Sequence, residues 1–175
     1  MRIRVAALLA LFTLLICAAA LGQDKTDSSK QKLTASSYAP VKEYDPKRDA
    51  AKDVAEAVKE AQRTNRNVLV EIGGQWCIWC KYLDKFFADH SALTQYREEN
   101  YVMVKVNFSP DNKNDAVISR YGKVPGYPHF FVLDKNGKLL HSQDTSKLEE
   151  GRGYNMTAVA NFLKEWSPDG SQTTK

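Results

Sequence analysis

Residues 68–81 have the sequence VLVEIGGQWCIWCK and join two elements of different periodicity. The first five residues form a short apolar run interrupted only by Glu71, which is typical of a strand buried on both faces. After a Gly-Gly-Gln connection, the apolar residues at positions 82, 83, 86 and 87 follow helical spacing. The sequence therefore predicts a buried strand, a short turn, and a helix whose first turn contains Cys77 and Cys80.

The spacing of these two cysteines predicts redox chemistry. A cysteine at the start of a helix faces unpaired N–H groups and the positive end of the helix dipole, which lower its thiol pKa and favour the nucleophilic thiolate. We therefore expect Cys77 to be an exposed nucleophile. Cys80, one turn later on the same face, is expected to be the buried resolving thiol that attacks a mixed disulfide on Cys77.

Two other interpretations of the pair stay open, namely buried thiols with no chemical role and a structural zinc site. Tetrahedral zinc needs two further ligands, and the candidates His90, His129 and His141 are scattered singly along the chain. The sequence thus predicts no metal site and no bound cofactor. The Cys77–Cys80 disulfide itself is expected to be the redox group.

Residues 1–22 have the layout of a secretory signal peptide. Arg2 and Arg4 precede an apolar run over residues 5–21. An uncleaved membrane anchor is the alternative, because a run of about 17 residues is at the short limit of a membrane span. We expect an exported protein, in the bacterial periplasm or secreted, and membrane-anchored if the segment is retained. If the signal is cleaved, Cys17 is lost with it, and Cys77 and Cys80 remain. A disulfide between these two closes so short a loop that it stabilises the fold little, which again favours redox chemistry.

The rest of the chain divides into three segments by composition. Residues 23–44 are polar and are interpreted as a flexible tether, residues 45–167 as the folded domain, and residues 168–175 as a polar tail. The first helix of the domain is expected to start at Asp45-Pro46, with the aspartate as cap and the proline at the first helical position. Apolar residues at positions 51, 54, 55, 58 and 61 would form its buried stripe.

The remaining elements alternate between helix and strand. Periodicity, an Asn-Gly turn signal and a cap at Asn155 predict a strand over residues 101–108, a short helix over 115–121, a hairpin of strands over 129–134 and 139–142, and a helix over 156–166. A helical crossover makes the first two strands parallel, and the hairpin makes the last two antiparallel. The fold class is therefore α/β, with a mixed central sheet of about four strands and helices on both faces.

Charge excludes one class of function. The formal net charge is +4, and Arg2 and Arg4 supply half of that excess. Outside this end there is no Lys/Arg-rich run with interleaved aromatic residues, so nucleic-acid binding is not expected.

Two separate motifs resemble the thioredoxin family. The first is VLVEIGGQWCIWCK, with a tryptophan before the first cysteine, and the second is VPGYPHFFVLD at residues 124–134. The predicted order of elements is also that of a thioredoxin fold, and the resemblance covers residues 45–166. It is strongest to exported bacterial members, such as the periplasmic reductase domain of the membrane electron carrier DsbD, which residues 86–90 (FFADH) also resemble.

The resemblance implies roles for residues that contact a substrate. Pro128 matches the proline that is cis in thioredoxins and faces the cysteines, with Pro125 as a less suitable candidate. The Tyr127 backbone would pair with an extended substrate peptide. Trp76 precedes the first cysteine as in the family, and Trp79 is expected either to form an apolar contact surface for a partner or to pack under the adjacent loop.

The resemblance also implies a proton acceptor. Glu71 falls at the buried acidic position of the family, where burial would raise the carboxyl pKa and suit it to take a proton from Cys80. Lys105, in the next strand, matches the lysine beside that acid. The alternative is a Glu71–Lys105 ion pair at a sheet end, partly solvated and without a catalytic role.

The residues between the cysteines depart from both cytosolic thioredoxin and the strong oxidants. Neither Ile78 nor Trp79 can donate a charge-assisted hydrogen bond to a thiolate, which argues against a strong oxidant. We therefore expect an exported, monomeric thiol:disulfide oxidoreductase that reduces disulfides of envelope proteins and takes electrons from a membrane thiol donor. An oxidase or isomerase of folding proteins, or a non-enzymatic metal-delivery module, is the alternative.

Overall fold

The central sheet has four strands in the order β2-β1-β3-β4. The computed structural model describes residues 38–170. The strands are β1 (Asn67–Gly73), β2 (Tyr101–Asn107), β3 (His129–Leu133) and β4 (Leu139–Asp144). Strand β1 pairs in parallel with β2 and antiparallel with β3, and β3 pairs antiparallel with β4. The predicted mixed sheet is therefore confirmed.

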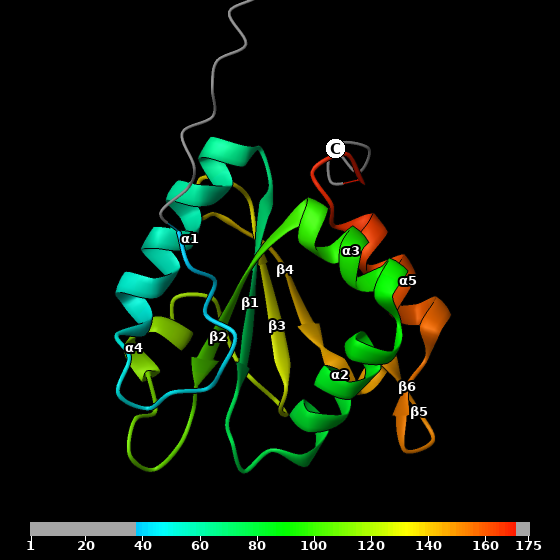
Figure 1. The fold of residues 1–175 in the computed structure, drawn as a ribbon. Helices are drawn as coiled ribbons and strands as arrows, with labels where there is room; N and C mark the ends of the chain where they lie inside the picture. The colour runs from blue at the N-terminus through cyan, green and yellow to red at the C-terminus, as the bar shows by residue number, and fades with distance from the viewer. Residues whose placement is uncertain (1–37, 171–175) are drawn as a thin grey trace, which may run out of the picture. The chain divides into compact units, whose positions relative to one another are not determined.

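Helices cover both faces of this sheet (Figure 1). One face packs against α1 (Ala50–Thr64) and α4 (Asp115–Ile118), and the other against α2 (Ile78–Asp89), α3 (Ser91–Asn100) and α5 (Met156–Glu165). Because successive side chains of a strand point to opposite faces, Val68, Val70 and Ile72 enter the first core and Leu69 enters the second. Glu71 therefore points to the same face as Leu69, toward α2.

The predicted start of the first helix is wrong by one turn. Asp45 accepts the backbone N–H of Arg48 at 3.3 Å and closes a separate turn, and the helix cap is Asp49, whose side chain accepts the Lys52 N–H at 3.1 Å. The predicted stripe is correct at Val54, Val58 and Ala61, which are buried or pack on the core, and wrong at positions 51 and 55, which are exposed. The buried face also includes Ala50, Asp53, Ala57 and Glu60. Two carboxylates lie on the buried face because arginines pair with them, and a purely apolar pattern misses such positions.

Residues 38–44 pack on the domain, so the predicted tether does not extend to residue 44. Val41 is buried and forms a parallel bridge to Val104, and its carbonyl accepts the N–H of Lys105 at 3.0 Å. Tyr38 donates its hydroxyl to the Met103 carbonyl at 3.3 Å. This segment covers the edge of β2, which would otherwise present unpaired backbone groups.

The signal peptide, residues 23–37 of the predicted tether and residues 171–175 of the predicted tail lie outside the described residues. In the range 38–170, no helix is long and apolar enough to cross a membrane.

A short segment between β4 and α5 was not predicted. It contains a 3-10 helix, η1 (Thr145–Leu148), and a two-stranded ribbon of β5 (Glu149–Glu150) and β6 (Gly153–Tyr154). The elements are too short to show a periodicity in the sequence. Figure 1 shows the ribbon beside α2, where the Tyr154 hydroxyl donates to the Trp79 carbonyl at 3.3 Å.

Candidate active site

The cysteine pair lies where β1 passes into α2. Cys77 is the N-cap of α2, and its Sγ accepts the backbone N–H of Cys80 at 3.1 Å. The two residues are joined by a disulfide, with their Cα atoms 5.3 Å apart. When the pair is reduced, this N–H and the positive end of the helix dipole stabilise a thiolate on Cys77, and Cys80 lies one turn further along the helix.

Exposure does not separate the two cysteines as expected. Cys77 is 3% and Cys80 is 1% exposed, so both are buried in the disulfide form. What distinguishes them is their surroundings. Cys77 is flanked by Trp76 and Ile78, which are 55% and 52% exposed. Cys80 faces the interior, and a β-carbon added to Gly73 would lie only 2.6 Å from its Sγ, so glycine is required there.

Aromatic residues from three loops meet beside the pair. The Trp76 indole N–H donates to the Phe108 carbonyl at 2.7 Å, and its ring meets the Tyr127 ring edge-on at 5.3 Å. Tyr127 in turn stacks on Phe108 at 4.9 Å. The Tyr127–Pro128 peptide bond is cis, as the resemblance implied. The structure therefore brings Trp76, Tyr127 and Pro128 together.

Trp79 occupies a different environment from Trp76. Its ring makes edge contacts with Tyr82 at 5.4 Å and with Tyr154 at 6.0 Å, and it is only partly exposed. Of the two expectations for Trp79, these contacts fit packing against neighbouring elements. The exposed apolar side chains next to the cysteines are Trp76 and Ile78.

Glu71 is buried at 1% exposure on the face of the sheet that carries α2. Burial raises the pKa of its carboxyl, and Lys105 and the Tyr44 hydroxyl act in the opposite direction. Lys105 is its register partner on β2, with Nζ 3.9 Å from Oε1, and the Tyr44 hydroxyl donates to the same oxygen. A carboxylate taken out of water in this way is retained only with such partners.

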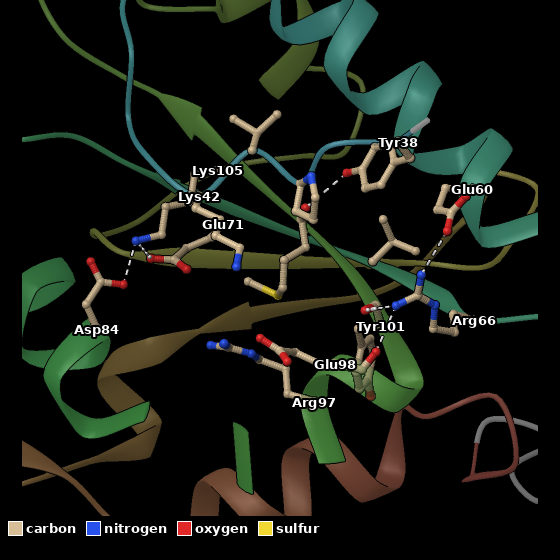
Figure 2. A pocket seen from close by; sticks show the side chains of 14 residues that line it. Tyr38, Lys42, Glu60, Arg66, Glu71, Asp84, Arg97, Glu98, Tyr101 and Lys105 are labelled. Carbon is tan, nitrogen blue, oxygen red and sulfur yellow. Dashed lines mark hydrogen bonds and ion pairs between the residues drawn. The ribbon is translucent and has the colours of Figure 1, made fainter. Parts of the chain in front are cut away.

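Lys105 connects Glu71 to α2. Its ammonium also contacts the Asp84 carboxylate. The side chain of Lys105 is 9% exposed, so the Glu71–Lys105 ion pair is buried rather than partly solvated at a sheet end. Figure 2 shows Lys105 between the carboxylates of Glu71 and Asp84 at one end of a cavity of about 420 Å³. A second cavity of about 410 Å³ adjoins Cys80 and shares Lys105 and Asp84 in its lining.

Sequence reasoning missed Tyr44 and Asp84. Asp84 follows Cys80 by four residues, so helical spacing alone would have placed the two on one face of α2. Tyr44 offered no comparable signal, because it stands in a polar segment far from the cysteines in the chain. Only the packing of residues 38–44 against β2 brings it to the site.

His129, which follows Pro128, is the first residue of β3 and is buried. Its Nε2 lies 2.8 Å from the Ser142 hydroxyl, and its ring meets the Phe131 ring at 4.8 Å. Burial lowers the pKa of His129 from 6.5 to about 4, against an opposing effect of Asp144. The residue is therefore neutral at neutral pH, with Nε2 paired to Ser142 and Nδ1 buried without a hydrogen-bond partner among the described residues.

This shift predicts a pH dependence of stability. The free energy of unfolding should fall as the pH drops from about 6.5 to about 4, because the unfolded chain then binds a proton at His129 that the native state does not. Above this window both states are neutral, and below it both are protonated. The total loss is about 3 kcal/mol. Urea unfolding over this pH range should show that His129→Gln removes this part of the slope.

Equal slopes for wild type and His129→Gln would show that burial does not hold the native imidazole neutral.

No group of three or more His, Cys, Asp or Glu residues within the range 38–170 is arranged to hold a metal ion.

Comparisons with known proteins agree with this geometry. A family model described as thioredoxin-like matches residues 49–135. Disulfide bond reductase DsbH of Chlamydia pneumoniae is 27% identical over 95 residues, which are 49% of this chain and 57% of the relative. Thiol:disulfide interchange protein DsbD of Colwellia psychrerythraea is 29% identical over 91 residues, which are 51% of this chain and 15% of that protein.

A solved structure shows the same fold. The disulphide isomerase from Xylella fastidiosa superposes with a TM-score of 0.60 at 24% identity, covering 69% of this chain and 92% of that one. At this identity the likeness concerns the fold alone. The chain spans only 57% of the DsbH relative and a much smaller share of DsbD.

Proposed function

Residues 49–135 belong to the thioredoxin-like family, which includes Dsb-type thiol:disulfide oxidoreductases, and from that premise we propose that this protein reduces disulfide bonds in other proteins. The observation that carries the proposal is the Cys77–Cys80 disulfide at the N-terminus of α2. Beside it lie an exposed tryptophan, Trp76, and the loop of Tyr127 and Pro128, which supply a surface for a substrate chain.

The reaction uses the pair in its reduced form. The Cys77 thiolate attacks one sulfur of a substrate disulfide, forms a mixed disulfide, and displaces the other substrate sulfur as a thiolate. Cys80 then attacks Cys77, so the enzyme disulfide forms and the second substrate sulfur leaves. The substrate gains two electrons and the enzyme loses two, and a dithiol donor must restore the reduced pair.

We infer the reducing direction from the modest stabilisation of a Cys77 thiolate. The observed hydrogen bond to its sulfur comes from a backbone N–H, that of Cys80, and the intervening Ile78 and Trp79 carry no positive charge. A strong oxidant owes its potential to a highly stabilised reduced form. The N-terminal segment supports export, and an oxidising envelope would require a membrane thiol donor to keep the pair reduced.

Isomerisation of wrongly paired disulfides is the second candidate. The observation that favours it is the pair of exposed apolar side chains, Trp76 and Ile78, which could hold unfolded chains. An isomerase needs a more oxidising pair than a reductase, since it must release a mixed disulfide as well as form one.

The redox potential distinguishes the two. Equilibration of the protein with a glutathione or dithiothreitol series is expected to give a value closer to about −270 mV, as in thioredoxin, than to about −180 mV, as in protein disulfide isomerase. With dithiothreitol as donor, the protein should reduce insulin and should regain little activity from scrambled ribonuclease. A potential near the higher value together with efficient ribonuclease refolding would favour the isomerase. Absence of insulin reduction would overturn the reductase proposal.

A further inference from the structure

The Tyr44 hydroxyl contacts the buried acid, and its side chain packs beside the two cysteines. It donates to Glu71 Oε1, and the side chain is 5% exposed and packs in one cluster with Cys77 and Cys80. A β-carbon placed on Gly73 would be 2.6 Å from Cys80 Sγ and 2.7 Å from the Tyr44 hydroxyl oxygen. The sulfur and the hydroxyl therefore occupy the same small space above this glycine.

We propose that Tyr44 carries the proton from Cys80 to Glu71 during the resolving step. The inference rests on the proposed function and deepens it, because it assigns a relay residue from outside the segment that matches the family, residues 49–135. In this relay the Tyr44 hydroxyl, which donates to Glu71 Oε1, links the acid to the cysteine.

Each proton and electron pair in this step has a destination. The Cys80 sulfur gives up its proton to the Tyr44 oxygen while the original Tyr44 proton passes to Glu71 Oε1. The Cys80 sulfur attacks Cys77 in the mixed disulfide, the Cys77–Cys80 bond forms, and the bond from Cys77 to the substrate sulfur breaks. The substrate sulfur leaves with the electron pair, and Tyr44 ends as it began, as a neutral phenol.

The surroundings of Tyr44 suit a transfer of this kind. Burial and the neighbouring Glu71 raise the pKa of its phenol well above the ordinary value, so the hydroxyl stays protonated and the two transfers must occur together. The ring is held in place, since Lys105 Nζ lies 4.8 Å from its centroid and Gln75 Nε2 donates to the Tyr44 carbonyl at 3.2 Å. A fixed ring keeps the hydroxyl on its acceptor, Glu71, beside the cysteine cluster.

The test follows the two sulfur steps separately with 5,5′-dithiobis(2-nitrobenzoate). The reduced protein releases one thionitrobenzoate when Cys77 attacks and a second when Cys80 resolves. Tyr44→Phe is expected to slow the second release by at least about tenfold, since general acid–base assistance is typically worth more than this, and to leave the first unchanged. Glu71→Gln should slow the same step. The double variant should be no slower than the slower single variant, because both substitutions break one relay.

The matched control is Tyr38→Phe. It removes a hydroxyl from the same N-terminal segment, where the partner is the Met103 carbonyl and not the cysteine site. Both releases should then proceed at the wild-type rates. A Tyr44→Phe variant that resolves as fast as wild type overturns the relay, and so does a double variant whose slowing is the product of the two single effects.

A second measurement needs no substitution, so it tests the relay even where the Tyr44→Phe variant does not fold. The rate of the second release by the wild type, measured in mixtures of H₂O and D₂O, should curve with deuterium content because two protons move together. A linear dependence, or none, contradicts the relay. The proposed function fails separately, if the reduced wild type does not reduce insulin or releases only the first thionitrobenzoate.

Discussion

Cys77→Ser is expected to lower disulfide reduction by at least about a thousandfold, to the background of the uncatalysed exchange. A serine hydroxyl at the N-cap of α2 can still accept the Cys80 N–H, so the helix is kept while the nucleophile is lost. Cys80→Ser should fail in the opposite way. It retains the Cys77 thiolate but cannot resolve, and covalent mixed disulfides with substrate proteins accumulate.

The measurement is non-reducing electrophoresis of each variant after incubation with a disulfide-containing protein, next to insulin reduction. The Cys77→Ser/Cys80→Ser double variant is the control for trapping that does not involve the pair. Since both cysteines are buried to a similar extent in the disulfide form, exposure alone does not predict the asymmetry. Equal trapping by the two single variants would contradict the assignment of Cys77 as nucleophile.

Glu71→Gln should have the next largest effect, slowing resolution by Cys80 roughly 10²–10⁴-fold while first attack by Cys77 changes little. Glutamine keeps the shape and can still accept the Tyr44 hydroxyl, but it cannot take a proton at neutral pH. Cys77 has the end of α2 to stabilise its thiolate, whereas Cys80 depends on the buried base. Stopped-flow tryptophan fluorescence on a model mixed disulfide, from about pH 6 to pH 9, follows this step.

Glu60→Gln is the matched control. Glu60 is also a buried carboxylate, but it lies on α1 and pairs with Arg63 at 2.8 Å and Arg66 at 3.3 Å. Its loss should reduce stability without changing the resolving rate. An unchanged resolving rate for Glu71→Gln over the whole pH range would make Glu71 a structural partner of Lys105 and Tyr44 only.

The elements that sequence predicted well are those with strong local signals. The apolar run of β1, the alternation of β2, the Asn-Gly hairpin and the Asn155 cap each depend on residues close in the chain, and each occurs in the structure. The position of Cys77 at the start of α2 was predictable for the same reason. The start of α1 was not, since Asp45 and Asp49 both have the chemistry of a cap and only one begins the helix.

The sequence by itself determined the cysteine pair, the buried strand with its acid, and the order of elements, because these follow from spacing and periodicity within short windows. Only the tertiary structure decided what surrounds the acid. Tyr44 reaches Glu71 and the cysteines because residues 38–44 lie along the exposed edge of β2, and Asp84 meets Lys105 because α2 crosses that face of the sheet. Such contacts join segments that are distant in the chain. A buried polar group needs a hydrogen-bond or ion-pair partner, and the local sequence pattern does not predict which distant residue supplies it.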